Sequence, residues 1–430
     1  MSKLLEVREF DKISCNPEYD EYKYLPEAVF KDLVNFIHAF SSDGEHADAL
    51  EFMTIGYRRN VGDIITMSNY VGLIQMDNGY QIQVLPKIEF TDSNETKKIF
   101  LRMLRSMKDF PSKVFNHAAL RTEEMSLYEV FISMYLQEVD RLVKRGLKSS
   151  YVTVNENLRF YKGKLLVNQH IKNNVSHNER FYVEYDDYNV NRAENRLIKS
   201  TLLKLNEITE SAHNNKQIRQ ELAAFEMVKP SYNYEKDFQK ITIDRNSKDY
   251  ETLMQWSKVF LMNKSFTTFS GDNNARALLF PMESLFESYV AQQLKKAYAH
   301  DDWDISLQDR HYYLFDEPRH QFALRPDIVM RDNNGNTVIL DTKWKKLIDS
   351  SRSNYGISQA DMYQMYAYSK KYETEHIVLI YPITAEMESH EDITFTSDDG
   401  VTVKVFFVDL RDMDKSMSAL KESIEGTLYG

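Results

Sequence analysis

One short stretch, residues 324–344, restricts the fold of this chain more than any other part of its sequence. Two β-prone runs, 322–330 and 337–340, flank the segment Asp332-Asn-Asn-Gly-Asn336, which has the composition of a tight hairpin turn. The second run is apolar and β-branched without polar alternation, as in a strand that is buried on both faces. The sequence therefore predicts an antiparallel strand pair inside a domain core, not a solvated surface hairpin.

Each strand carries an acidic residue at the end remote from the turn. Asp327 lies at the start of the first strand and Asp341 at the end of the second. If the turn is an odd-numbered loop centred on Asn334, the two acids face each other, with Cβ atoms about 4.5 to 5.5 Å apart. A two-residue Asn-Gly turn would instead shift the pairing by one residue. In the first register the carboxylates could share one small divalent cation, and they would repel each other without it.

The lysine after the second acid completes a candidate catalytic group. Side chains alternate along a strand, so Lys343 faces the same way as Asp341, and Thr342 faces away. Acids that hold Mg²⁺, with a cation that orients a water and offsets developing negative charge, can cut a phosphodiester. Each half of this pattern is also common by chance. Pro326-Asp327 with Asp341-Thr342-Lys343 nevertheless resembles the signature of the PD-(D/E)XK nuclease superfamily.

The elements predicted around this motif occur in the α-β-β-β-α-β order of the core of that superfamily. They are a helix at 281–298, strands at 303–315, 321–330 and 336–344, a helix at 358–372 and a strand at 376–382. A further strand at 401–408 and a terminal helix from 412 complete the region. Gln364 and Tyr368 on the second helix are four residues apart and share a face. Tyrosines at this spacing are more often core residues, but the Gln-x-x-x-Tyr order after the D-x-K strand favours a role beside the site.

The length of 430 residues, of which 42% are hydrophobic, allows two or three domains with separate cores. We expect a mixed α/β region at 1–120, a helical and β region at 121–270, and the nuclease region at 271–430. The predicted fold class is therefore a multidomain α+β or α/β protein.

Charge and cysteine content exclude several other classes. The net charge of -11 argues against a protein that coats DNA nonspecifically, although basic residues can still cluster on one face of an acidic enzyme. A single cysteine, Cys15, excludes an internal disulfide framework and a zinc ribbon. The first ten residues are charged, and no apolar run reaches spanning length. We therefore expect a soluble, cytoplasmic protein.

Two basic motifs outside the nuclease region suggest phosphate binding only superficially. Lys162-Gly-Lys164 is followed by Leu165 and does not match the phosphate-loop pattern, so this chain is not expected to hydrolyse nucleotides. Polar side chains on a helix through 195–205 could contact phosphates, although a solvated helix face is the simpler interpretation. These side chains are Arg192, Asn195, Arg196 and Lys199.

Motifs in both halves of the chain resemble the McrC family, the nuclease subunits of McrBC-type modification-dependent restriction systems. Besides the two nuclease motifs, they are Lys144-Arg-Gly-Leu147, Tyr161-Lys-Gly-Lys-Leu165, Asn191-Arg-Ala-Glu-Asn-Arg-Leu-Ile-Lys-Ser-Thr201 and Met282-Glu-Ser-Leu-Phe-Glu-Ser-Tyr289. The resemblance covers roughly residues 125 to 410. Val71-Gly-Leu-Ile-Gln75 and Gln83-Val-Leu-Pro-Lys-Ile88 add a less specific similarity in the amino-terminal region.

The resemblance implies a division of labour. An AAA+ GTPase of the McrB type reads methylated cytosine and remodels double-stranded DNA, while this chain docks on it, stimulates GTP hydrolysis and cuts. Asp327 and Asp341 would bind Mg²⁺, with Mn²⁺ as a substitute, and Lys343 would be the catalytic lysine. The Thr342 carbonyl and Glu287 are additional candidate ligands.

Two other functions remain open at this point. A stand-alone nuclease of the same superfamily would use the same site without a GTPase. A non-catalytic activator would keep the nuclease fold only as a scaffold, although such degenerate sites usually lose an acid or the lysine, and all three residues are present here. A neighbouring gene for an AAA+ protein would separate the first alternative from the McrC-type function.

Overall fold

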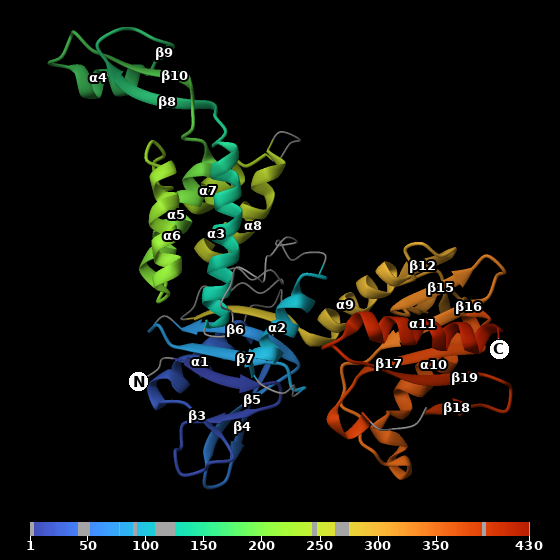
Figure 1. Ribbon diagram of the computed structural model, residues 1–430. Coiled ribbons are helices and arrows are strands. Elements are labelled where there is room, and N and C mark those ends of the chain that lie inside the picture. The colour runs from blue at the N-terminus through green and yellow to red at the C-terminus, as the bar shows by residue number, and fades with distance from the viewer. Residues whose placement is uncertain are drawn as a thin grey trace. The chain divides into compact units, whose positions relative to one another are not determined.

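The computed structural model describes residues 4–41, 52–76, 78–88, 93–107, 125–242, 247–262, 275–388 and 393–429 (Figure 1). The chain divides into two compact units, one formed by Met1–Lys113 with Leu278–Gly430 and the other by Val114–Ala277. The predicted domain boundaries at 120 and 270 fall outside the described residues, so the three-region division stays a prediction. The first unit nevertheless joins residues from the first and third predicted regions.

The amino-terminal part of the first unit contains two four-stranded sheets. One has the order β1-β7-β6-β11, with β1 Leu4–Arg8, β7 Gln81–Leu85, β6 Tyr70–Met76 and β11 Ala275–Pro281. The other has the order β3-β2-β5-β4, with β3 Lys23–Tyr24, β2 Lys12–Ser14, β5 Gly62–Met67 and β4 Met53–Arg58. Helices α1 Glu27–Ser41 and α2 Ser93–Leu104 accompany them.

Gly72 on β6 illustrates how closely these strands approach. A Cβ atom at this position would lie 1.9 Å from the backbone oxygen of Leu278, and the φ of Gly72 is +137°. Only glycine satisfies both constraints without moving the backbone.

The carboxy-terminal part of the first unit is a six-stranded sheet of order β12-β15-β16-β17-β19-β18. The strands are β12 Trp303–Leu307, β15 Ile328–Asp332, β16 Thr337–Thr342, β17 His376–Pro382, β19 Thr402–Val408 and β18 Thr394–Thr396. β17 lies parallel to β16 and β19, and the other neighbours are antiparallel. Helices α9 Met282–Ala297 and α10 Gln359–Tyr372 contact β16, and α11 Met413–Tyr429 contacts β19.

Two predicted strands, 303–315 and 321–330, are wrong in extent because each is interrupted. β13 Tyr313–Phe315 and β14 Gln321–Ala323 pair with each other as a separate two-stranded sheet. Gln308 has a φ of +46°, which ends β12 because strand residues require negative φ. Pro326, which has no N–H to donate to a ladder, lies between β14 and β15.

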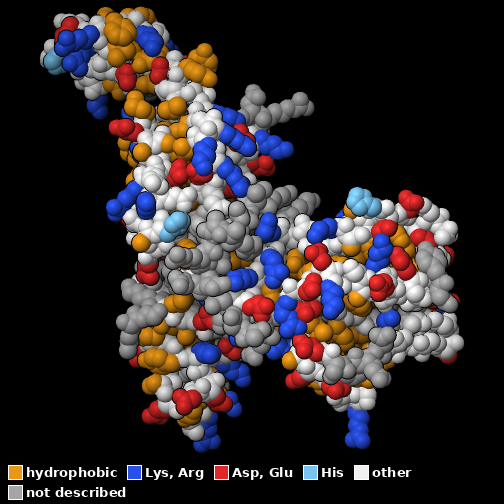
Figure 2. All heavy atoms as spheres, in the orientation of Figure 1, with side chains coloured by type: hydrophobic (Ala, Val, Ile, Leu, Met, Phe, Trp, Pro, Cys, Tyr) orange, Lys and Arg blue, Asp and Glu red, His pale blue; other side chains and the backbone are white. Residues whose placement is uncertain are grey.

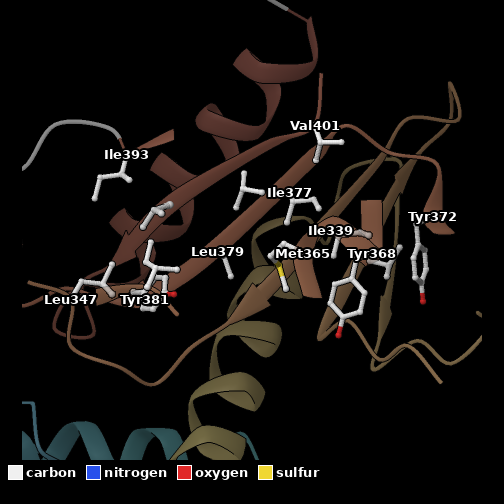
Figure 3. Close-up of a cluster of buried hydrophobic side chains, with 14 of the residues drawn as sticks. Ile339, Leu347, Met365, Tyr368, Tyr372, Ile377, Leu379, Tyr381, Ile393 and Val401 are labelled. Carbon is white, nitrogen blue, oxygen red and sulfur yellow. The ribbon is translucent and has the colours of Figure 1, made fainter. Parts of the chain in front are cut away.

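The core beside α10 shows which residues of the sheet face this helix. Met365 and Tyr368 of α10 cluster with Ile339 on β16 and with Ile377 and Leu379 on β17, as Figure 3 illustrates. Successive strand residues alternate between faces, so Asp341 and Lys343 follow Ile339 on the α10 side. The hydrophobic packing of α10 therefore also determines where the D-x-K residues point.

The second unit is mainly helical. Its helices are α3 Leu127–Arg145, α4 Val167–Asn174, α5 Ala193–Ile208, α6 Ala212–Ala224, α7 Tyr234–Gln239 and α8 Glu251–Met262. A three-stranded antiparallel sheet contains β8 Ser150–Leu158, β10 Phe181–Asn189 and β9 Lys164–Leu165 in that order. Within the described ranges, no helix combines the length and apolar character that crossing a membrane requires.

Candidate active site

The hairpin between β15 and β16 has the register predicted for a loop centred on Asn334. Ile328 pairs with Leu340 and Arg331 with Thr337, and Asp332 closes a three-residue loop by bonding to Asn336. Gly335 in this loop has a φ of +90°, which favours glycine. Asp327 and Asp341 are therefore the residues next in register beyond the last pair, at the end remote from the turn.

Lys343 lies beside Asp341, as the alternation along β16 predicted. Its Nζ atom is 2.6 Å from Asp341 Oδ2 and donates a 3.2 Å hydrogen bond to Gln364 Oε1. The Gln364 amide in turn donates a 2.7 Å bond to the hydroxyl of the buried Tyr368. Of the predicted pair on α10, Gln364 contacts Lys343 directly, and Tyr368 contacts Gln364.

Thr342, which is predicted to face away from Asp341 and Lys343, contacts the other acid of the site. Its hydroxyl and its backbone N–H both donate 2.7 Å hydrogen bonds to Asp327 Oδ2. Asp327 precedes the first residue of β15, so strand alternation does not constrain its side chain. These two bonds fix the Asp327 carboxylate against the end of β16.

Asp361 is a fourth charged residue of the site that sequence reasoning missed. Its Oδ1 lies 3.8 Å from Lys343 Nζ, and its backbone N–H is capped by the Ser358 side chain at the start of α10. The Ser-x-x-Asp spacing of a helix cap, together with the shared face of Asp361 and Gln364, is the signal that could have identified it.

Burial shifts the ionisation of both acids. It raises the pKa of Asp341, where the neighbouring charge of Asp327 adds to the effect and Lys343 opposes it. Burial also raises the pKa of Asp327, against the hydrogen bonds from Thr342. For Lys343, burial alone would lower the pKa, but Asp341 and the other nearby acids raise it on balance. The lysine is therefore held as a cation beside two carboxylates that resist full ionisation.

The donor set fits a divalent cation only in part. Asp341 Oδ2 is buried and receives no aligned hydrogen bond from the described residues, although Lys343 lies within ion-pair distance. The described part of the chain contains no cluster of three or more His, Cys, Asp or Glu side chains arranged for a metal. Glu287 on α9 accepts a 2.9 Å bond from Gln308, and burial followed by the charge of Asp327 raises its pKa to about 7. The roles of Glu287 and of the Thr342 carbonyl as ligands stay predictions.

These shifts lead to a prediction for metal binding. A carboxyl group must lose its proton to bind Mg²⁺ or Mn²⁺. A raised pKa therefore makes protons stronger competitors of the metal ion. We expect Mn²⁺ affinity to fall as the pH is lowered from about 8 to about 6, well above the usual range of aspartate near 4. Calorimetric titrations with Mn²⁺ at each pH would measure this. Affinity that stays constant over this range would contradict the raised pKa values of Asp327 and Asp341.

The polar side chains on α5 form neither a phosphate site nor a freely solvated face. Asn195 is buried and donates to the carbonyls of Lys148 and Val190. Arg196 pairs with Asp237 at 2.7 Å. Arg192 donates to the Glu194 carboxylate. Lys199 donates to the carbonyls of Phe225 and Val228. These residues therefore hold the helical unit together.

A buried acid, a half-buried acid and a lysine, at or just beyond the ends of two neighbouring strands of a mixed sheet that helices cover, define a class of candidate hydrolytic sites. The family model described as McrBC 5-methylcytosine restriction system component matches residues 65–382. This match covers more than half of the chain, so the chain belongs to that family. No curated protein sequence matches it significantly.

Two solved structures are similar to the chain. One is the refined half-complex from a tetradecameric assembly of Thermococcus gammatolerans McrB AAA+ hexamers with bound McrC, with 20% identity, a TM-score of 0.74, and coverage of 99% of this chain and 100% of that chain. The other is the cryo-EM structure of the Thermococcus gammatolerans McrBC complex, with 21% identity, a TM-score of 0.46, and coverage of 68% and 88%. The first likeness shows a shared multidomain α/β fold.

Proposed function

We propose that this chain is the Mg²⁺-dependent DNA endonuclease subunit of a 5-methylcytosine restriction system. The observation that carries the proposal is the position of Lys343 Nζ, 2.6 Å from Asp341 and 3.2 Å from Gln364. Asp327 lies directly before the neighbouring strand β15, next in register to Asp341. Membership of the McrBC family supports DNA as the substrate.

Each residue has a distinct role in this proposal. A divalent ion held by Asp327 and Asp341 would polarise the scissile phosphate and make a bound water more acidic. The Lys343 ammonium orients the attacking water and offsets the negative charge that develops on the phosphate. Gln364 holds that ammonium in place, and Tyr368 fixes Gln364. The active site thus extends from the strands to α10.

We also propose that the chain docks on an AAA+ GTPase of the McrB type and stimulates it. The chain shares its fold with a chain of an assembly of McrB hexamers with bound McrC, and this supports such a partner. Delivery by a ring that already holds DNA would raise the effective concentration of substrate at this site. The chain then needs little intrinsic affinity for DNA.

We therefore expect the chain alone to cut DNA poorly at physiological salt. Its net charge of -11 gives weak long-range attraction for a polyanion. On the face that Figure 2 shows, described Lys and Arg side chains are interspersed with Asp and Glu rather than forming one basic surface. Only a short basic strip, Lys343, Lys345 and Lys346, follows the second acid. Efficient cutting should require the GTPase, GTP and Mg²⁺.

A plasmid-cleavage titration tests this prediction on methylated and unmethylated DNA, with and without the partner. Strong, methylation-blind cutting by the chain alone would favour a stand-alone nuclease. Stimulation of GTP hydrolysis without any cutting would favour a non-catalytic activator. Cutting of methylated DNA only in the complete mixture would support the proposed function.

A further inference from the structure

Glu9 is a buried acid outside the proposed catalytic group. It contacts Trp344, the residue directly after Lys343. Glu9 follows β1 and is only 3% exposed. Its two carboxylate oxygens accept hydrogen bonds of 3.1 and 3.0 Å from the Trp344 indole Nε1. Its Oε2 also accepts a 2.8 Å bond from the backbone N–H of Lys87, just beyond β7. Glu9 thus joins the amino-terminal sheet to the end of β16.

The side chain of Lys87 contacts the main chain of the same tryptophan. The Lys87 ammonium donates a 2.9 Å hydrogen bond to the Trp344 carbonyl and lies 4.0 Å from Glu9 Oε1. Together Glu9 and Lys87, named here the Trp344 clamp, bond to both the side chain and the backbone of this residue. The indole ring also packs against Phe286 of α9, with centroids 5.4 Å apart.

Trp344 directly follows Lys343, and this neighbourhood gives the clamp its significance. The regular strand β16 ends at Thr342. The Lys343 backbone N–H still bonds to the Ile380 carbonyl of β17 at 2.8 Å. Beyond that bond the clamp holds the backbone. The peptide after Lys343 is therefore anchored from β17 on one side and from the amino-terminal sheet on the other.

The electrostatics of the clamp argue against a purely packing role. Burial raises the pKa of Glu9 against the opposing charge of Lys87, and burial lowers the pKa of Lys87. A buried ion pair is often no more stabilising than apolar side chains of similar volume. What the pair adds is direction, because it places two acceptors opposite one indole N–H and one donor opposite one carbonyl.

We propose that Glu9 and Lys87 are positioning residues, which hold Lys343 in place beside Asp341 and Gln364 by fixing Trp344. This inference rests on the proposed nuclease function. It makes the amino-terminal sheet a structural requirement for cutting rather than a separate module. Misplacing a catalytic group by about 1 Å can lower a rate by roughly a hundredfold.

The test uses the full chain with its GTPase partner, GTP and saturating Mg²⁺. Glu9→Ala should lower the single-turnover cutting rate by about 10- to 100-fold, with unchanged Mn²⁺ affinity and DNA concentration dependence. Glu9→Gln, which keeps one acceptor for the indole, should recover part of this loss. Glu6→Gln on the preceding strand β1 is the matched control, because Glu6 accepts a bond from Gln83 and not from Trp344. The control should cut at the wild-type rate.

A double variant distinguishes positioning from general damage. If Glu9 acts through Lys343, then Glu9→Ala combined with Lys343→Ala should cut no more slowly than Lys343→Ala alone. An additive loss, or a folded Glu9→Ala protein that cuts normally, would overturn the inference. If Glu9→Ala does not fold, Trp344→Phe removes the indole N–H and keeps a smaller aromatic ring against Phe286. It should show the same kinetic loss, and normal cutting by that variant would equally overturn the inference.

One measurement does not depend on cutting. Mass spectrometry after brief reductive methylation reports how accessible each lysine amine is, and Glu9→Ala should increase the labelling of Lys343 at least threefold relative to Lys370. Unchanged labelling would overturn the clamp. If the wild-type complex does not cut DNA at all while Lys343 labelling rises, the proposed function fails and the positioning of Lys343 stands.

Discussion

Replacing Asp341 by Asn should lower the rate of DNA cutting by more than about a thousandfold. The substitution keeps the shape of the side chain but removes the buried charge that pairs with Lys343 at 2.6 Å and that would bind the metal. Asp341 is only 2% exposed, so we do not expect a docked partner to contact its side chain. Partner binding and GTPase stimulation should therefore stay close to wild type. Plasmid cleavage and GTP hydrolysis measured on the same complex would test both expectations.

The matched control is Asp304→Asn, which removes an exposed acid from β12 of the same sheet. This variant should cut normally. Full cleavage by Asp341→Asn would refute the assignment of the site, and a loss of GTPase stimulation with it would show that the change acts through the fold.

The Asp341→Asn variant should be more stable than the wild type in metal-free buffer near neutral pH. Burial raises the pKa of Asp341 in the folded chain above its value in the unfolded chain. The unfolded state therefore ionises first as the pH rises, and the folded state loses stability from about pH 4 upward. Asn at this position has no charge to bury. Its advantage in the free energy of unfolding should disappear below about pH 4, where the wild-type acid is protonated in both states.

Lys343→Ala should separate metal binding from chemistry. The two carboxylates remain and should still bind Mn²⁺, but the water loses its orienting cation and the developing charge loses its counterion. We expect the cutting rate to fall by about 100- to 1,000-fold while calorimetry still detects metal binding. Arginine at this position is not an equivalent replacement, because a planar guanidinium cannot occupy the compact space of an ammonium.

Lys370→Ala is the control for a change of charge near the site. Lys370 lies on α10, the helix that carries Gln364, but it is exposed and paired with Asp399. This variant should cut normally. If Lys343→Ala lost the metal and kept its cutting rate, the roles assigned to the lysine and the acids would be wrong.

The sequence alone determined the parts of the site that depend on local rules. The turn composition of Asp332–Asn336 left two registers open, and the structure selected the three-residue loop that aligns Ile328 with Leu340 along β15 and β16. Strand alternation then places Lys343 with Asp341, and helical periodicity places Gln364 with Tyr368. These relations span only a few residues or one turn, so the pattern of residue types specifies them.

Only the tertiary structure decided how these local pieces meet. The distance of Lys343 from Gln364 depends on how α10 packs against Ile339 and Ile377, and no local pattern encodes that packing. Glu9 bonds to Trp344 across 335 positions of the chain. Such contacts arise because burial brings distant segments together and forces each buried polar group to find a partner. A periodic pattern identifies which residues are buried, whereas the partner that satisfies each of them follows only from the folded arrangement.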